Sequence, residues 1–218
     1  MTRIVIVDVC GTLYDENTTA GFVRFVAGAG LLRRPRLFRL LERLRRGPAR
    51  KVVTALGGMI GRDLFRTGYI RCLAGITRSD LEARATAYAE ALDAGKKIAV
   101  AHERLAHFEA DGWRPVMVSN SLDVVIAAIA DRKGCDWLAS TLDWRGDVCA
   151  GILARDLKGR KLAAFEEIFG ALPADRLSVM TDNRSDADVM NAASVAVLVA
   201  KGHPKPWMRQ HVGEQLRH

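Results

Sequence analysis

Several residues able to do chemistry stand where short apolar runs of the chain end. Asp8, Ser119 and Asp182 each come at the end of such a run, and the runs are rich in β-branched residues. Runs of this kind are typical of buried parallel strands, and parallel strands bring their carboxyl ends to one edge of a sheet. We therefore expect these three side chains to lie close together.

Further polar residues accompany these three in the sequence. Asn120 follows Ser119, Asp186 follows Asp182 at a spacing of four, and Lys158 and Lys161 lie in a turn ahead of an apolar helix pattern. Clustered carboxylates repel one another unless a cation lies among them, and Mg²⁺ prefers carboxylate oxygens together with water and phosphate. A lysine and a hydroxyl beside that metal would complete a cradle for a phosphoryl group. A single aspartate here would more simply be a turn or capping residue, but the joint pattern favours a phosphate site.

The elements that position these residues alternate between strand and helix. Strand patterns cover residues 3–9, 115–118, 137–141, 148–153, 177–180 and 196–199, with helical patterns at 122–130 and 160–169 and almost throughout 18–107. Within the long helical stretch, Ser79 and Glu82 have the form of a capping box and predict a helix start. The alternation predicts an α/β fold in which a Rossmann-like parallel sheet is sandwiched by helices, with an inserted helical cap domain. The expected core is 1–16 and 108–218, and the expected cap is 17–107.

The positive charge of the chain is concentrated in one segment. The 218 residues carry a net charge of +8, and Arg33–Lys51 contains eight arginines and one lysine against Glu42 alone. Its leucines recur at helical spacing, so one interpretation is a solvated helix that packs its leucines on a neighbour. A second interpretation is a surface for an anionic lipid or a polyanionic substrate. Nucleic acid is the least favoured partner, because Phe38 is the only aromatic residue among the arginines.

The composition also bears on whether the chain folds and on the cellular compartment in which we expect it. Hydrophobic residues make up 49% of the chain and charged residues 27%, which suits one folded domain with an insert and argues against disorder. No apolar stretch approaches the ~20 residues that cross a bilayer. The cysteines lack CxxC spacing. We expect reduced thiols in a cytoplasmic protein, with contact at the inner membrane surface left open by the basic segment. The sequence carries no signal for an oligomeric state.

The residues at the strand ends resemble a known set of motifs. The series Asp8-x-x-Gly11-Thr12-Leu13, then Ser119, Lys161 and Asp182-x-x-x-Asp186 is similar, in order and context, to the four motifs of the haloacid dehalogenase superfamily. The Ser119-Asn120-Ser121 form and the stretch 151–165 look most like the phosphoserine-phosphatase-like branch. That branch has a helical cap after its first motif, so the resemblance covers the core well and the cap only in position and helical character.

The resemblance implies an Mg²⁺-dependent phosphatase that acts on a small phosphorylated metabolite. Asp8 would attack phosphorus and form an aspartyl-phosphate, which water then hydrolyses. The metal would be held by Asp8, Asp182 and the backbone carbonyl of Cys10. Asp186 would be a further ligand, or an acid just behind the ligands.

The resemblance also implies the groups that hold the phosphate. Ser119 and the backbone N–H of Asn120 would bind its oxygens, and Lys161 would neutralise the charge that develops on them. Lys158 is the competing lysine. Lys161 is favoured because Leu162 and Phe165 follow it, as in the Lys-apolar-x-x-apolar pattern of the family.

Cys10 is the main departure from the family pattern. Phosphatases of this superfamily place a second aspartate there, which protonates the leaving oxygen and later activates water. A thiol replaces a carboxylic acid poorly, and general acid–base help is worth ~10²–10⁴ in rate. One expectation is a phosphatase that acts on substrates with good leaving groups, or one that recruits another acid from the cap or the substrate to protonate the leaving oxygen. Alternatively the chain runs a related reaction (dehalogenation, phosphonate cleavage or phosphoryl transfer), or it is a catalytically weak homologue that binds a phosphorylated ligand.

The residues that leave the first motif form a last candidate group. Tyr14, Asn17 and Thr18 stand where the chain passes from the expected core to the expected cap. They could line the site as a flap, and a plain hinge explains them equally well.

Overall fold

The fold is built on one mixed sheet. The computed structural model describes residues 2–210 and 213–218, and its seven strands run in the order β4-β3-β2-β1-β5-β6-β7. The strands are β1 (Arg3–Val7), β2 (Trp113–Leu122), β3 (Asp136–Arg145), β4 (Val148–Arg155), β5 (Leu177–Thr181), β6 (Val195–Ala200) and β7 (Glu214–Arg217). All neighbours pair in parallel except β3 and β4, which form a hairpin. The predicted Rossmann-like α/β fold is confirmed.

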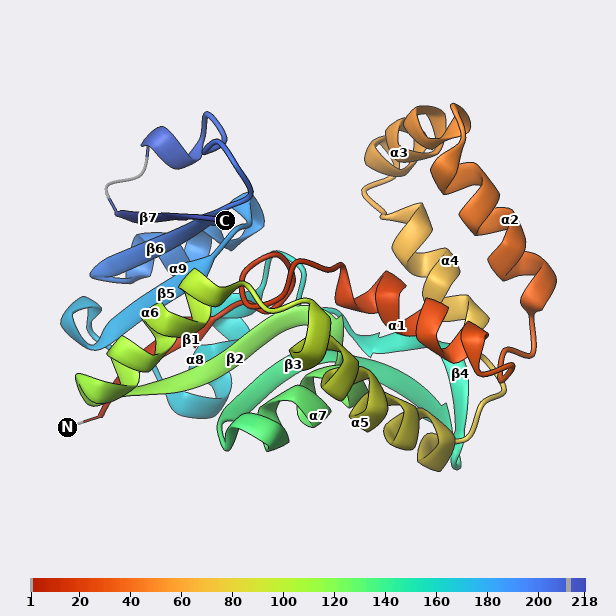
Figure 1. The fold of residues 1–218 in the computed structure, drawn as a ribbon, viewed down its shortest axis with the longest axis horizontal. Coiled ribbons are helices and arrows are strands. Elements are labelled where there is room, and N and C mark those ends of the chain that lie inside the picture. The colour runs from red at the N-terminus through yellow and green to blue at the C-terminus, as the bar shows by residue number, and fades with distance from the viewer. Residues whose placement is uncertain (1, 211–212) are drawn as a thin grey trace.

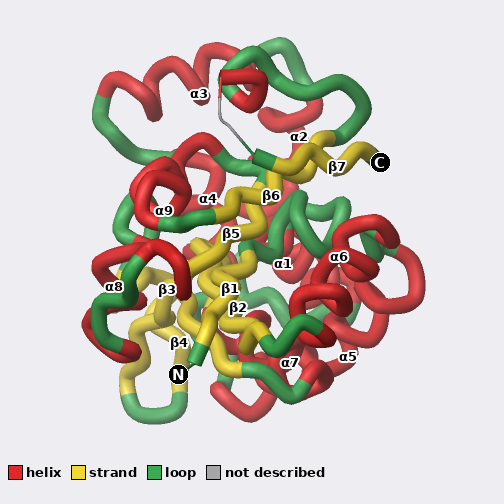
Figure 2. Tube along the Cα trace, turned by 90° about the vertical axis from the view of Figure 1, so that its left-hand side faces the viewer, coloured by secondary structure: helices red, strands yellow, loops and turns green. Residues whose placement is uncertain are grey.

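Helices cover both faces of this sheet. Six of the described helices lie between β1 and β2: α1 (Thr18–Gly28), α2 (Pro35–Arg46), α3 (Ala49–Met59), α4 (Leu64–Cys72), α5 (Arg78–Gly95) and α6 (Ala99–Ala110). The later helices are α7 (Asp123–Lys133), α8 (Lys161–Phe169) and α9 (Ala187–Ala192), with short 3₁₀ segments at 174–176, 184–186 and 208–210. The sheet lies between α8 and α9 on one side and α5, α6 and α7 on the other (Figure 2). None of the described helices is long and apolar enough to cross a membrane.

The inserted helices do not all project from the sheet. Helices α2 and α3 extend away from it at one end of the molecule, and α4 leads back from them to pack against β4 (Figure 1). By contrast, α5 packs against α7, and α6 packs against β2 and β7. The division into a core of 1–16 and 108–218 and a cap of 17–107 stays a prediction, in which α2 and α3 are the part that stands clear of the sheet.

The alternation of side chains along β1 explains why this strand is an unbroken apolar run. Ile4 and Ile6 pack into the hydrophobic cluster that α8 and α9 share, whereas Val5 and Val7 pack into the larger cluster on the opposite face. A central parallel strand is buried on both faces, so each position must be apolar. The polar residue that ends the run is therefore forced to the edge of the sheet.

Side-chain caps set where the inserted helices begin. Asn17 accepts a hydrogen bond from Ala20 N at the start of α1, and Asp63 accepts one from Arg66 N at the start of α4. The predicted capping box at Ser79 is wrong, because Thr77 is the N-cap of α5 and accepts from Asp80 N at 3.2 Å. Two adjacent Ser/Thr–x–x–acid patterns overlap here, and the earlier one forms the cap.

Candidate active site

The loops after β1 and β5 are locked together at the carboxyl edge of the sheet. Asp8 N donates to the carbonyl of Met180 at 2.9 Å, and Asp182 N donates to Oγ1 of Thr12 at 3.0 Å. Gly11 has φ +72°, and a Cβ on it would lie 2.6 Å from Oδ2 of Asp182. Only glycine fits such a close approach at a positive φ. The structure thus brings Asp182 against the loop that Asp8 begins.

Lys161 lies between two carboxylates in the interior of this edge. Its Nζ donates to Oδ1 of Asp8 and to Oδ2 of Asp186, each at 2.7 Å, and Oγ1 of Thr181 also donates to Oδ2 of Asp186 at 2.7 Å. Asp8, Lys161 and Asp186 are all buried. Burial lowers the pKa of Lys161, but the two carboxylates outweigh this and raise it above its usual value. The ammonium therefore stays charged.

The structure brings Lys161, and not Lys158, against Asp8. Lys161 is the first residue of α8, and its side chain is 1% exposed. Lys158 lies three residues earlier on the exposed loop and lines a cavity instead. The helix start determines which of the two lysines points inward, because only Lys161 belongs to the helix that packs on the sheet.

The carboxylates of Asp8 and Asp182 influence one another. Burial, and then the charge of Asp8, raises the pKa of Asp182 to about 6. Burial also raises the pKa of Asp8, against the lowering effect of Lys161. Lys205 donates to the backbone carbonyl of Asp182 at 3.2 Å, and its Nζ lies 3.7 Å from the carboxylate. Gathered carboxylates of this kind are stabilised when a cation lies between them.

The oxygen atoms at this edge suit a hard divalent cation. Asp8, Asp182 and the backbone carbonyl of Cys10 offer the ligand type that Mg²⁺ prefers. Within residues 2–210 and 213–218, no three His, Cys, Asp or Glu side chains are grouped so as to hold a metal ion. Asp186 is instead engaged by Lys161 and Thr181. A metal here would thus depend on a backbone oxygen and on ligand oxygens as well as on the two aspartates.

The carboxyl end of β2 approaches the Asp8 loop through a chain of polar groups. Ser121 N donates to Oγ of Ser119 at 3.3 Å, and Oγ1 of Thr18 donates to Oγ of Ser121 at 2.7 Å. Cys10 Sγ lies 2.7 Å from the same Thr18 hydroxyl. Burial, and then the charge of Asp8, raises the pKa of Cys10 to about 11. Cys10 is therefore a protonated thiol in a polar contact.

The three predicted flap residues have separate places. Tyr14 is buried and donates from its hydroxyl to Oδ1 of Asp93 at 2.8 Å, so it belongs to the packing around α5. Asn17 caps α1 and lines a cavity, and Thr18 contacts Cys10. The structure brings Asn17 and Thr18 toward the site and leaves Tyr14 away from it.

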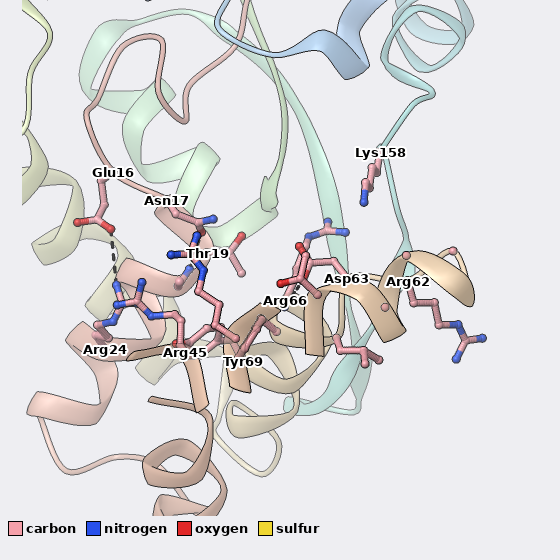
Figure 3. Close-up of a pocket in the computed structure, with 18 residues that line it drawn as sticks. Glu16, Asn17, Thr19, Arg24, Arg45, Arg62, Asp63, Arg66, Tyr69 and Lys158 are labelled. Carbon is pink, nitrogen blue, oxygen red and sulfur yellow. Dashed lines mark hydrogen bonds and ion pairs between the residues drawn. The ribbon is translucent and has the colours of Figure 1, made fainter. Parts of the chain in front are cut away.

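A cavity of about 550 Å³ opens beside this site, between the inserted helices and the loop ahead of α8. Its lining includes Asn17 and Thr19, on either side of Thr18, but not Asp8. Arg24 and Arg45 lie on one side of it, with Arg66 farther along and Lys158 entering from across the cavity (Figure 3). Sequence reasoning placed Arg45 in the basic segment and missed Arg24 and Arg66, which no local pattern distinguishes from the other arginines.

The sequence of residues 5–191 matches the profile of the haloacid dehalogenase-like hydrolases. The chain belongs to this family. Its predicted membership of the superfamily is thereby confirmed. A search of curated proteins found no matching sequence.

Solved structures agree with this family in fold. A protein of unknown function from Bordetella pertussis Tohama I is 16% identical at a TM-score of 0.74, with 96% of this chain and 94% of that one covered. A haloacid dehalogenase-family hydrolase of Salmonella enterica serovar Typhi is 16% identical at a TM-score of 0.64, and the match covers 98% of this chain and 66% of that one.

The branch of the family is also represented among these structures. A phosphoserine phosphatase solved as an analogue of its phospho-aspartyl intermediate is 13% identical at a TM-score of 0.61, with 99% of this chain and 93% of that one covered. The likeness is one of fold, and it confirms the predicted resemblance to the phosphoserine-phosphatase-like branch.

Proposed function

We propose that this hydrolase is an Mg²⁺-dependent phosphatase that acts on a small phosphorylated metabolite. The observation that carries the proposal is the buried Asp8 carboxylate, bonded to Lys161 at 2.7 Å beside Asp182. A carboxylate held next to a permanent cation at the open edge of a parallel sheet is suited to attack an anionic phosphorus centre.

In the proposed reaction Asp8 is the nucleophile. Its carboxylate oxygen forms a bond to phosphorus while the bond from phosphorus to the leaving oxygen breaks, which gives an aspartyl-phosphate and a free alcohol or acid. Water then attacks phosphorus, releases phosphate and restores Asp8. Ser119 and the Asn120 N–H would bind the phosphate oxygens, and Lys161 would hold Asp8 in place and stabilise the developing negative charge.

The proposed metal ligands are Asp8, Asp182 and the backbone carbonyl of Cys10. The bound ion would neutralise phosphate charge and so lower the barrier to attack by an anionic carboxylate. The hydrogen bonds of Asp186 to Lys161 and Thr181 support its role as an acid behind the ligands that orients Lys161. This interaction fixes the position of the ammonium relative to Asp8.

Cys10 limits the substrates that such an enzyme can hydrolyse well. Its protonated thiol, engaged by Thr18, offers neither a good acid nor a base. We expect acyl and aryl phosphates, whose leaving groups need little protonation, to be hydrolysed faster than alkyl phosphates. The same observation favours a second candidate, a catalytically weak homologue that binds a phosphorylated ligand. Dehalogenation, phosphonate cleavage and phosphoryl transfer are the remaining alternatives.

The test is a panel of phosphomonoesters assayed for phosphate release with Mg²⁺ and with excess chelator. We expect metal-dependent turnover that Asp8→Asn removes, with acetyl phosphate and p-nitrophenyl phosphate ahead of glycerol phosphate. Tight binding of a phosphorylated ligand without turnover of any member would instead favour the weak homologue. Turnover that survives Asp8→Asn would exclude the proposed nucleophile.

We further propose that the projecting helices contact an anionic surface. Four apolar side chains on one side of α3 and just beyond it are exposed: Val52 60%, Leu56 51%, Met59 83% and Ile60 60%. They adjoin the arginines of α2, and this combination is typical of helices that bind anionic lipid. The test is sedimentation with anionic and with neutral vesicles at low and high salt. Absence of binding to both would leave α2 and α3 as solvated helices.

A further inference from the structure

The cavity beside the site is lined by more cations than its own acids can neutralise. Six of its lining residues are basic (Arg24, Arg45, Arg50, Arg62, Arg66 and Lys158), whereas only Glu16 and Asp63 are acidic. Some of the six have partners outside the lining, such as the Glu42 carboxylate 3.0 Å from Nε of Arg24. Among the described residues, Arg50, Arg62 and Lys158 have no ion-pair partner.

The uncompensated cations lie on different elements around one opening. Arg50 is on α3, and Lys158 is on the loop between β4 and α8. Nε of Arg45 is buried without a hydrogen-bond partner, and the Glu42 carboxylate lies 3.7 Å from it. Gathering like charges around one cavity is unfavourable unless an anion enters between them. At about 550 Å³ the cavity also falls in the size range of small-ligand sites.

We propose that this cavity binds a second anionic group of the substrate, a phosphate or a carboxylate distant from the phosphate that is transferred. The substrate class is then a phosphomonoester with two anionic ends. This inference rests on the proposed phosphatase function, because it assigns the cavity to the part of the substrate that is not transferred. Arg50 and Lys158 are the specificity residues, since both line the cavity from different elements and neither has an ion-pair partner among the described residues.

The experiment compares ligands that differ only in their second end. Isothermal titration measures the affinity for short α,ω-alkane bisphosphonates, ω-carboxyalkylphosphonates and the matching alkylphosphonates, none of which the proposed reaction cleaves. We expect at least one chain length of either two-ended series to bind about tenfold more tightly than its one-ended match. The better of the two series identifies phosphate or carboxylate as the second group.

Variants show whether the preference arises in the cavity. Arg50→Gln and Lys158→Gln should each lower the ratio of two-ended to one-ended affinity. Arg36→Gln removes the same charge from an exposed position outside the cavity and should leave the ratio unchanged. Equal affinity for both classes, or a preference that Arg36→Gln reduces as much, overturns the inference. Tighter binding of the two-ended ligands by a protein that shows no phosphatase turnover overturns only the proposed reaction.

A separate observation concerns the guanidinium of Arg66, which reaches from α4 into the carboxyl edge of the sheet. Nη2 donates to the carbonyl of Asn120 at 2.6 Å and to Oγ of Ser140 at 3.0 Å, while Nη1 donates to Oδ2 of Asp156 at 2.7 Å. Ser140 Oγ in turn accepts from Leu157 N at 3.0 Å. One side chain of the inserted helices thus connects the carboxyl end of β2 with β3 and with the residue that follows β4.

The contact with the Asn120 carbonyl affects residues 119–121 at the end of β2, the segment proposed to bind phosphate. In a trans peptide the carbonyl and the following N–H point in opposite directions. Because Arg66 holds the carbonyl of Asn120, the N–H of Ser121 is turned the other way, where it donates to Oγ of Ser119 at 3.3 Å. The arginine fork, which forms several hydrogen bonds in a fixed plane, keeps this peptide from rotating.

We infer that Arg66 is a positioning residue that couples α4 to the end of β2, where Ser119 and Asn120 are proposed to bind phosphate. Movement of α4 away from the sheet breaks three hydrogen bonds at once and frees the peptide that orients Ser119. The orientation of the Asn120–Ser121 peptide is therefore fixed only while α4 is in place. A substrate that draws the inserted helices towards the sheet would therefore fix the groups that bind its phosphate, Ser119 and the N–H of Asn120.

Hydrogen exchange tests this coupling without any need for turnover. Arg66→Gln should raise the exchange rate of the amides at 119–121 by about tenfold or more, whereas Arg71→Gln, an exposed arginine on the same helix, should not. Asp156→Asn removes the ion pair but keeps the bond to Asn120. It should lower the melting temperature with a smaller change at 119–121.

Kinetics adds the functional readout. If the phosphatase is active, Arg66→Gln should lower kcat more than it raises KM, and Arg66→Lys should rescue little because lysine lacks the fork. Exchange at 119–121 that stays as in the unsubstituted protein overturns the inference. So does an increase of the same size in Arg71→Gln.

Discussion

Glu42 offers the sharpest test of how the projecting helices are held. It is the one acid within the arginine-rich segment, and its side chain is only 12% exposed. Oε1 of Glu42 accepts from Nε of Arg24 at 3.0 Å and from the hydroxyl of Tyr69, and Oε2 accepts from Nη2 of Arg46 at 3.1 Å. These bonds connect α2 with α1 and α4, so Glu42→Gln should loosen all three helices.

The magnitude follows from the exposure of each partner. Tyr69 is buried and Arg24 is mostly buried, so each loses a hydrogen bond to a charged group worth ~1.5 kcal/mol. Arg46 is 74% exposed, so the loss of its ion pair with Glu42 costs only about a few tenths of a kcal/mol. The sum is about 3 kcal/mol of unfolding free energy. For a chain of this size we expect a fall in melting temperature of about 6–12 °C.

The assay is chemical and thermal denaturation at neutral and at acidic pH. Burial opposes ionisation of Glu42, but Tyr69 and Arg24 outweigh it and hold the pKa of this carboxyl below its usual value. A lowered native pKa gives stability that is present above the unfolded value and is lost as the pH falls through the native value. The difference between Glu42→Gln and the unsubstituted protein should therefore vanish in acid.

The control is Glu82→Gln. Glu82 is 55% exposed, and its carboxylate is no closer than 3.9 Å to Arg78. The loss of its charge should therefore change the free energy of unfolding by less than ~0.5 kcal/mol. A melting temperature for Glu42→Gln equal to that of the control would refute the reasoning. It would mean that apolar packing alone holds α2 against α1 and α4.

The remaining predictions concern the site and the packing around it. Asp8→Asn should abolish turnover while the protein stays folded, since Lys161 keeps its bond to Asp186; circular dichroism and phosphate release check both parts. Cys10→Asp should speed alkyl phosphate hydrolysis by roughly tenfold or more by restoring the acid, and an unchanged rate would show that acid help is not limiting. Burial lowers the pKa of His102 to about 4, with Lys133 also disfavouring the charged ring. The unfolded state binds more protons between pH 4 and 6.5, so stability should fall across that window as the pH drops, by about 2 kcal/mol at most, given the partial exposure of the ring. His102→Gln should flatten that part of the stability–pH curve; an unchanged curve would show that the ring is not responsible.

The sequence-based predictions were most successful where local pattern and chain topology agree. The unbroken apolar run before Asp8 could only be a strand buried on both faces, and the structure has it as β1, paired with β2 and β5. The prediction of the capping box at Ser79 failed because two overlapping patterns fit the local rule equally well. Thr77 forms the cap since α5 begins at Arg78, two residues earlier than a cap at Ser79 requires.

The inserted helices show the limit of periodicity. The sequence shows helices throughout 18–107, but α4, α5 and α6 pack against elements of the core while α2 and α3 project from it. Amphipathic patterns record that a helix has a buried face and do not record which surface covers that face. Partners of α4 such as Asn120 are distant in sequence, so Arg66 could not be distinguished from any other arginine.

The amino-acid order by itself determined that carboxylates, a serine and a lysine would meet at one edge of a parallel sheet, because strand topology brings carboxyl ends together wherever β-branched runs alternate with helices. Tertiary structure alone decided that Cys10 contacts Thr18 and that arginines of four helices surround a cavity. The family pattern had favoured Lys161 over Lys158, and the structure has its ammonium between Asp8 and Asp186. Such contacts join residues up to 153 positions apart. They depend on how whole elements pack, and no local propensity encodes that packing.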